Sequence, residues 1–102
     1  MNLLGLLQQA RISMTNNNEN MACRVCGLTQ LEPPWGNDGK LPNFEICDCC
    51  GVEFGYEDRT FSSVNNYRKK WLEKGSPWFY SKEKPENWNL QDQLQNVPDN
   101  FK

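Results

Sequence analysis

Two short cysteine motifs constrain the fold of this chain more than any other feature. The first spans Cys23–Gly27 (CRVCG) and the second spans Cys47–Gly51 (CDCCG), with 20 residues between Cys26 and Cys47. Each reads C-x-x-C-G, a turn in which the chain folds back and both cysteine sulfurs point to the same spot. Glycine after the second cysteine permits the tight reversal, often at positive φ. Two such turns at this separation are typical of a four-thiolate metal site.

We predict that the metal is held by Cys23, Cys26, Cys47 and Cys50. Four thiolates at about 2.3 Å complete the tetrahedral coordination of zinc and leave no open position, so the site is expected to be structural. Iron is the competitor, because a rubredoxin also uses two C-x-x-C-G turns and the ligand set does not separate the two metals. A shorter spacer and a helix-rich second half weaken the rubredoxin interpretation.

The second motif contains a fifth cysteine, which leaves the identity of the fourth ligand open between Cys49 and Cys50. Cys50 is favoured because, with Cys47, it reproduces the spacing of the first motif and is followed by glycine. Cys49 is then expected in the turn with its side chain pointing outward. We interpret it as a spare cysteine, and the alternative is a reactive thiol.

Composition indicates one small domain that needs a metal for stability. The chain has 102 residues, of which 37% are hydrophobic, with a net charge of −2. A typical globular share is about 45–50%, so the thin core is expected to depend on the metal and on the aromatic side chains. The chain lacks the roughly 20 consecutive apolar residues of a membrane span. We therefore expect a cytoplasmic protein, in which reduced cysteines bind metal rather than form disulfides.

The chain divides into three predicted segments. Residues 1–21 are expected to be a flexible extension, with room for a short amphipathic helix at residues 3–10. The true start codon is open between Met1, Met14 and Met21. Residues 22–58 form the four-cysteine metal module. Residues 59–98 form a helical and aromatic half that packs on it.

The predicted fold class is small α+β, with a zinc-ribbon-like antiparallel β module followed by one or two α-helices. Three short strands are expected, at 28–31, 43–47 and 52–56, and apolar and polar residues alternate in the second and third of them. Residues 60–75 then read as a helix, capped by Thr60 or Ser62 and ended by Gly75. Its apolar stripe has helical spacing and consists of Val64, Tyr67, Trp71 and Leu72. Asn89 is expected to cap a final short helix.

The residue types argue against catalysis. The chain has no histidine, which removes histidine acid–base chemistry and any His-ligated catalytic zinc. The acidic residues Glu45, Glu53, Glu57 and Asp58 are interpreted as a solvated face rather than as catalytic carboxylates. We therefore predict a structural-zinc protein without enzymatic activity.

A basic and aromatic surface in the second half is the candidate for function. It comprises Arg68, Lys69, Lys70, Lys74, Trp78 and Phe79. A protein partner is the first expectation, because tryptophan and tyrosine are frequent hot spots of protein interfaces. The alternative is a nucleic-acid-binding accessory module with the lysine-rich helix as its contact, disfavoured because the whole chain is acidic. A rubredoxin-like iron electron carrier is the second alternative. Oligomeric state is not readable from the sequence.

From residue 22 to about residue 97 the chain resembles a widespread family of small, uncharacterised bacterial cysteine-rich proteins. The resemblance implies a zinc-ribbon-like module followed by helices, and brings no activity, substrate or catalytic residue. Relatives often carry proline or another small residue at the position of Cys49. The matching motifs are Cys23-x-x-Cys26-Gly27, Glu32-Pro33-Pro34, Phe44-Glu45-Ile46-Cys47-x-x-Cys50-Gly51, Phe54-Gly55-Tyr56-Glu57-Asp58, Tyr67-Arg68-x-x-Trp71, Gly75-x-x-Trp78-Phe79 and Pro85-x-x-Trp88.

Overall fold

The structure, a computed structural model, describes residues 20–102. In chain order it contains the α-helix α2 (Phe61–Glu73), the 3₁₀ helix η1 (Ser81–Glu83), the α-helix α3 (Leu90–Leu94) and the 3₁₀ helix η2 (Asp99–Phe101). The predicted flexible extension with its short helix, and the alternative starts at Met1 and Met14, lie outside the described residues. No helix within 20–102 has the length and apolar character needed to cross a membrane.

The predicted zinc-ribbon-like β module is wrong, and with it the α+β class. In residues 20–102 the only β pairing is two isolated bridges, Ala22 with Thr29 and Ile46 with Glu53. The rest of residues 22–60 is turn and loop. Each cysteine motif forms one bridge where the chain folds back, but the pairing does not extend into strands.

Interruptions close to each motif explain why the strands do not form. Pro33 and Pro34 follow the first bridge, and proline has no N–H to donate to a ladder. Before the second bridge lie Pro42 and, two residues later, Phe44 at φ 61°, a left-handed conformation that breaks extended backbone. Alternation of apolar and polar residues in such short runs is therefore a weak strand signal.

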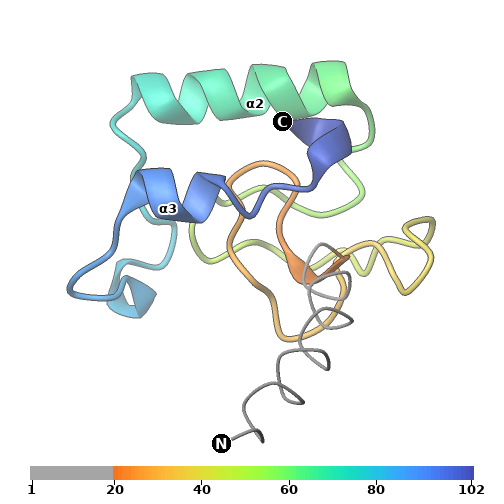
Figure 1. The fold of residues 1–102 in the computed structure, drawn as a ribbon, viewed down its shortest axis with the longest axis horizontal. Coiled ribbons are helices and arrows are strands. Elements are labelled where there is room, and N and C mark those ends of the chain that lie inside the picture. Colours follow the sequence, from red (N-terminus) through yellow and green to blue (C-terminus); the bar gives the residue numbers. More distant parts are fainter. Residues whose placement is uncertain (1–19) are drawn as a thin grey trace, which may run out of the picture.

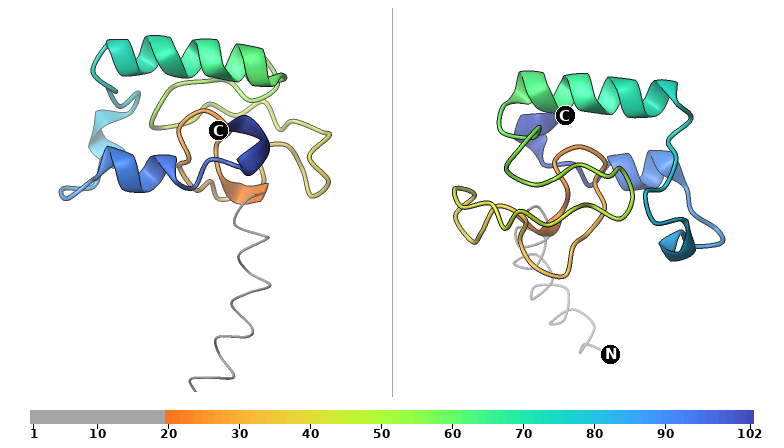
Figure 2. Two further views of the ribbon diagram at one scale, coloured as in Figure 1. Left: turned by 45° about the horizontal axis from the view of Figure 1, so that its top comes forward. Right: turned by 180° about the vertical axis from the view of Figure 1, so that it is seen from behind.

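The helices enclose the cysteine loops on one side. Figures 1 and 2 show α2 running across one edge of the molecule, with α3 and the two loop segments of the cysteine motifs beneath it. The C-terminal η2 packs against α2. The main buried cluster combines the five cysteines with a small set of apolar side chains: Val25, Val52, Phe54, Val64 and Trp71.

The helix predicted at 60–75 is confirmed as α2. Thr60 is the N-cap: its Oγ1 accepts from the Ser63 N–H at 3.1 Å, and Ser63 Oγ accepts from the Thr60 N–H at 3.2 Å, a capping box. At the other end Gly75 adopts φ 93°, and the Gly75 and Ser76 N–H groups donate to carbonyls of the last turn, as in a Schellman motif. The predicted stripe is buried at Val64 and Trp71 but not at Leu72, which is 38% exposed.

The short final helix is also confirmed. Asn89 Oδ1 accepts from the Asp92 N–H at 2.9 Å and caps α3. After α3, Val97 is buried and Pro98 leads into η2. The Gln93 and Val97 backbone packs directly on Gly27, the glycine of the first cysteine motif. This contact connects the C-terminal segment to the metal module.

Candidate metal centre

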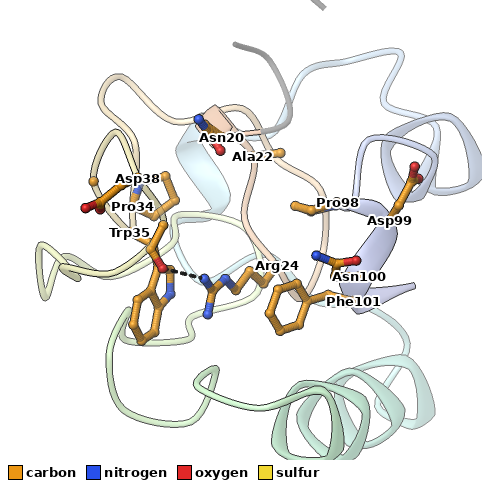
Figure 3. A pocket seen from close by; sticks show the side chains of 12 residues that line it. Asn20, Ala22, Arg24, Pro34, Trp35, Asp38, Pro98, Asp99, Asn100 and Phe101 are labelled. Atoms are coloured by element: carbon orange, nitrogen blue, oxygen red, sulfur yellow. Dashed lines mark hydrogen bonds between the residues drawn. The ribbon is translucent and has the colours of Figure 1, made fainter. Parts of the chain in front are cut away.

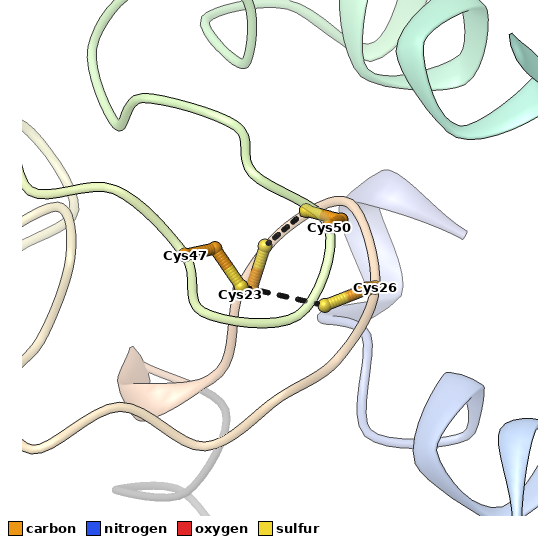
Figure 4. Close-up of side chains that lie close together, drawn as sticks. All are labelled: Cys23, Cys26, Cys47 and Cys50. Atoms are coloured by element: carbon orange, nitrogen blue, oxygen red, sulfur yellow. Dashed lines mark hydrogen bonds between the residues drawn. The ribbon is translucent and has the colours of Figure 1, made fainter. Parts of the chain in front are cut away.

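Four cysteine sulfurs meet in the interior of the protein. The Sγ atoms of Cys23, Cys26, Cys47 and Cys50 all lie within 4.8 Å of one another, and all four residues are buried. Cys23 Sγ lies 3.7 Å from Cys50 Sγ, and Cys26 Sγ lies 3.6 Å from Cys47 Sγ (Figure 4). A tetrahedron with metal–sulfur bonds of about 2.3 Å has sulfur–sulfur edges of about 3.8 Å. The cluster therefore has the size of a four-thiolate metal site.

The two motifs adopt the same backbone turn. The Gly27 N–H donates to the Cys23 carbonyl and the Gly51 N–H to the Cys47 carbonyl, each at 2.9 Å. Both glycines have positive φ, 85° and 81° respectively. The Val25 N–H donates to Cys23 Sγ at 3.4 Å, the kind of contact that offsets thiolate charge. The turn geometry expected from C-x-x-C-G is thus present twice.

The cysteine thiols have divergent acidities. Burial raises the pKa of Cys26 and of Cys50 well above the usual value for a thiol. Hydrogen bonds from the Cys23 and Cys26 thiols lower the pKa of Cys47. A dense group of sulfurs that resists full ionisation needs a cation to hold four thiolates together. The four clustered cysteines could hold a metal ion that binds thiolates.

Cys49 does not point outward as predicted. Its side chain is fully buried, yet it is not one of the four clustered sulfurs, so Cys50 rather than Cys49 completes the cluster. Cys49 Sγ accepts a hydrogen bond from Gln93 Nε2 at 3.3 Å. The hydrogen bond explains how a polarisable sulfur is accommodated beside the cluster, on the side that α3 covers.

Gln93 is the residue that the sequence interpretation missed. Its Nε2 also donates to the Cys26 carbonyl at 3.1 Å, and its Oε1 accepts from the Trp88 indole N–H at 2.8 Å. The buried amide thus connects both cysteine motifs to the C-terminal segment. Its position could have been found, since Gln93 lies at helical spacing within the apolar stripe of Leu90, Leu94 and Val97.

Two further side chains contact the metal module from outside the cluster. Gln30 Nε2 donates to the Leu28 carbonyl at 3.0 Å and lies 3.6 Å from Cys47 Sγ. The Tyr67 hydroxyl donates to the Cys50 carbonyl at 3.0 Å. Burial raises the pKa of Tyr67 to about 12, so the phenol stays protonated as a donor at neutral pH. The Tyr67–Cys50 hydrogen bond therefore connects helix α2 to the second cysteine motif.

Arg68 does not belong to an open basic surface. Its Nε donates to the Val25 carbonyl at 2.7 Å, and its Nη2 donates to the carbonyls of Arg24, at 2.9 Å, and Phe101. Burial lowers its pKa, and the neighbouring cysteine sulfurs oppose that shift. The side chain fastens the first motif and the C-terminus to α2, which is a structural role.

The remaining predicted surface residues divide between a cleft and open solvent. Lys70, Lys74, Trp78 and Phe79 line one cleft of about 430 Å³, whose wall also contains Tyr67, Trp71 and Cys50. We call this the aromatic–lysine cleft. Lys69 is exposed but does not line it. The structure therefore brings four of the six predicted interaction residues together, directly beside a cysteine of the cluster.

A second buried arrangement fixes the loop between the motifs. The Arg24 guanidinium lies 4.0 Å from the Trp35 ring centre and 4.3 Å from that of Phe101, at the wall of a pocket of about 530 Å³ (Figure 3). Asp58, predicted to be solvated, is fully buried and accepts from the Trp35 indole N–H at 2.9 Å and the Gly55 N–H at 2.7 Å. It is a structural carboxylate.

Comparison with known proteins gives two relatives from Bacillus subtilis (strain 168). The uncharacterized protein YozI is 36% identical over 69 residues, which cover 52% of this chain and 57% of YozI. The uncharacterized protein YoaQ is 32% identical over 80 residues, covering 64% of this chain and 68% of YoaQ. This chain belongs to the YoaQ family. Neither name states a ligand or an activity for the family, and the chain spans little more than half the length of YozI.

No family model matches the chain, and no solved structure matches it. The YoaQ family membership agrees with the bacterial cysteine-rich group that the sequence motifs indicated. The zinc-ribbon part of that resemblance is not supported, since residues 20–102 contain no strands.

Proposed function

We propose that this protein is a cytoplasmic structural-zinc protein that acts as a protein-interaction module without catalysis. The observation that carries the proposal is the cluster of four buried sulfurs with the spacing of a tetrahedral thiolate site. Zinc is favoured because four protein thiolates with no open position are typical of structural zinc. The cytoplasm is favoured because none of the five cysteines in residues 20–102 forms a disulfide, and in a reducing compartment paired C-x-x-C turns hold metal instead.

Three features support a structural rather than a catalytic role. The four cysteines are at most 6% exposed, which leaves a substrate no path to the metal. The chain has no histidine to serve as a base. The buried carboxylate Asp58 is occupied by the Trp35 indole and the Gly55 backbone. Metal binding in such a site contributes directly to folding.

The proposed contact with a partner is the aromatic–lysine cleft. Phe79, which is 52% exposed, lies at its edge, Lys70 lies in the last turn of α2 and Lys74 is the C-cap of that helix. An exposed aromatic ring flanked by cations suits an acidic protein segment with an apolar anchor. Because Cys50 forms part of the cleft wall, loss of the metal would deform this surface.

Elemental analysis of the purified protein tests the metal. We expect one zinc ion per chain and a colourless protein. A coloured protein with one iron per chain would instead support the electron carrier. A protein that keeps its circular dichroism and its melting temperature after complete metal removal would contradict the structural role.

A pull-down from the native host tests the interaction. The double variant Lys70→Ala/Lys74→Ala should lose a protein that the wild type captures. The matched control Lys69→Ala/Lys82→Ala changes two exposed lysines outside the cleft and should keep it. Equal capture by both variants would contradict the cleft as the contact surface.

Nucleic acid is the second candidate, because the same cleft places two lysines beside stacking rings. Fluorescence anisotropy with a labelled single-stranded oligonucleotide distinguishes it. Binding that the cleft variant loses and the control retains would favour this alternative over a protein partner.

A further inference from the structure

A second surface lies beside the second cysteine motif and shares only Trp78 with the aromatic–lysine cleft. It is a groove of about 540 Å³, which we call the acidic groove. Four carboxylate side chains line it, and none of its lining residues is basic: Glu32, Glu45, Asp48 and Glu83. Charges of one sign around a hollow create a local potential that attracts the opposite charge.

The acidic groove also carries apolar side chains. Leu31 is 98% exposed and Ile46 is 42% exposed, and Trp78 and Pro85 complete the apolar part of the lining. Exposed apolar side chains gathered in a hollow with a polar rim are typical of a protein contact site. The carboxylates supply selectivity and the apolar residues supply contact area.

The backbone of the groove offers unpaired hydrogen-bonding groups. Thr29 and Ile46 each occupy a position between the two flanking hydrogen bonds of an antiparallel bridge. In such a pair the N–H and C=O groups of the central residues point away from the partner segment. Neither residue has a backbone hydrogen-bond partner within the part of the chain that the structure describes. Both line the groove.

We propose that the acidic groove binds an extended segment of a partner protein that carries lysine or arginine between apolar residues. The lysine or arginine side chains would pair with the four carboxylates of the groove. The extended backbone of the segment would form hydrogen bonds with the unpaired N–H and C=O groups of Thr29 and Ile46. A nucleic acid is repelled here because its phosphates carry the same sign as the groove. The proposal extends the interaction role proposed above to a different surface.

Trp78 provides a reporter at the groove wall. Its indole N–H is buried without a hydrogen-bond partner among residues 20–102. The other three indole N–H groups each have an acceptor: Trp35 donates to Asp58, Trp71 to the Pro77 carbonyl and Trp88 to Gln93. The Trp78 indole resonance is therefore expected to be distinct in a nitrogen–proton NMR spectrum and to shift when the groove is occupied.

The test begins with a displayed library of random ten-residue peptides, panned against the full metal-loaded chain. We expect the enriched peptides to carry net positive charge with apolar residues at alternate positions. Enrichment of neutral or acidic peptides, or of none, would overturn the proposal. The best peptide, labelled with fluorescein, then serves as the probe for affinity measurements.

Two matched variants locate the site. Glu45→Gln/Glu83→Gln should weaken binding of the labelled peptide by about fivefold, the scale of two exposed charge pairs. Glu73→Gln/Glu86→Gln removes the same charge outside the groove and should change the affinity less than twofold. Equal losses for the two variants would mean non-specific attraction and would overturn the proposal. Addition of the peptide should also shift the Trp78 indole resonance more than those of Trp35 and Trp71.

The same probe separates this proposal from the aromatic–lysine cleft. Lys70→Ala/Lys74→Ala should leave peptide affinity unchanged, and a loss there would overturn the acidic groove while leaving the cleft in place. Analytical sedimentation of the protein without peptide tests whether a second copy of this chain occupies the groove instead. A concentration-dependent dimer that Glu45→Gln/Glu83→Gln abolishes would mean a second copy of this chain, and would overturn the choice of a foreign peptide.

Discussion

The backbone carbonyl of Gln93 occupies the space in which a Cβ atom on Gly27 would lie. This contact places α3 directly on the first cysteine motif, where Gly27 also needs its positive φ of 85°. Two physical requirements therefore coincide at one residue: a backbone conformation that side chains rarely adopt, and a close approach of two backbones.

Gly27→Ala is expected to destabilise the protein severely, because the new methyl group would have to displace the α3 backbone. Gly75→Ala is the matched control, since Gly75 also has positive φ (93°) but has nothing within 4 Å of an added Cβ. The control should lower the free energy of unfolding by about 1 kcal/mol from backbone strain alone. Urea unfolding of the two variants measures the difference, and equal losses would contradict a role for the contact.

Substitution of a clustered cysteine should remove the metal. Cys23→Ser is expected to lower metal content from one ion per chain to a small fraction and to unfold much of the protein, because the cluster contributes folding free energy. Cys49→Ala should retain the metal, since Cys49 lies outside the four clustered sulfurs. Mass spectrometry under native conditions measures both. Metal loss on changing Cys49 alone would show that the fourth ligand had been assigned incorrectly.

Arg68→Lys is expected to destabilise the protein although the charge is kept. A lysine ammonium cannot reproduce the planar fork that reaches the carbonyls of Val25, Arg24 and Phe101. The free energy of unfolding should fall by about 2–3 kcal/mol, because hydrogen bonds of this type involve a charged donor. Lys69→Ala on the same helix should change stability by less than about 0.5 kcal/mol. Chemical unfolding at neutral pH compares the two variants. An unchanged free energy of unfolding for Arg68→Lys would contradict the assigned role of Arg68.

Gln93→Leu tests the amide that joins α3 to the cysteine motifs. The substitution leaves the Cys26 carbonyl without one donor and the Trp88 indole N–H without its acceptor. Leaving buried polar groups unpaired costs about 1–3 kcal/mol each, so the melting temperature should fall by several degrees. Gln91→Leu on the exposed side of α3 is the control and should leave it nearly unchanged. A similar melting temperature for both variants would remove Gln93 from the structural network.

The sequence by itself determined the parts of this protein that depend on short-range chemistry. Both C-x-x-C-G turns, an N-cap at Thr60 or Ser62 and the Asn89 cap each involve residues within a few positions of one another, while the motif spacing favoured Cys50 over Cys49 but left the fourth ligand open. A turn, a cap or a helical stripe is stabilised largely by its own neighbours, so its pattern is readable without the fold.

Tertiary structure decided the rest, because the remaining features depend on partners distant in the chain. The short β bridges are a mixed case, because the neighbouring prolines are visible in the sequence whereas the positive φ of Phe44 is visible only in the structure. Arg68 does not join the predicted basic surface, because its guanidinium donates to the carbonyls of Val25 and Phe101. Gln93 of α3, distant in the chain, covers the buried Cys49 and donates a hydrogen bond to its Sγ. Whether a polar side chain is exposed depends on which donors and acceptors the fold brings to it, and the local sequence does not contain that information.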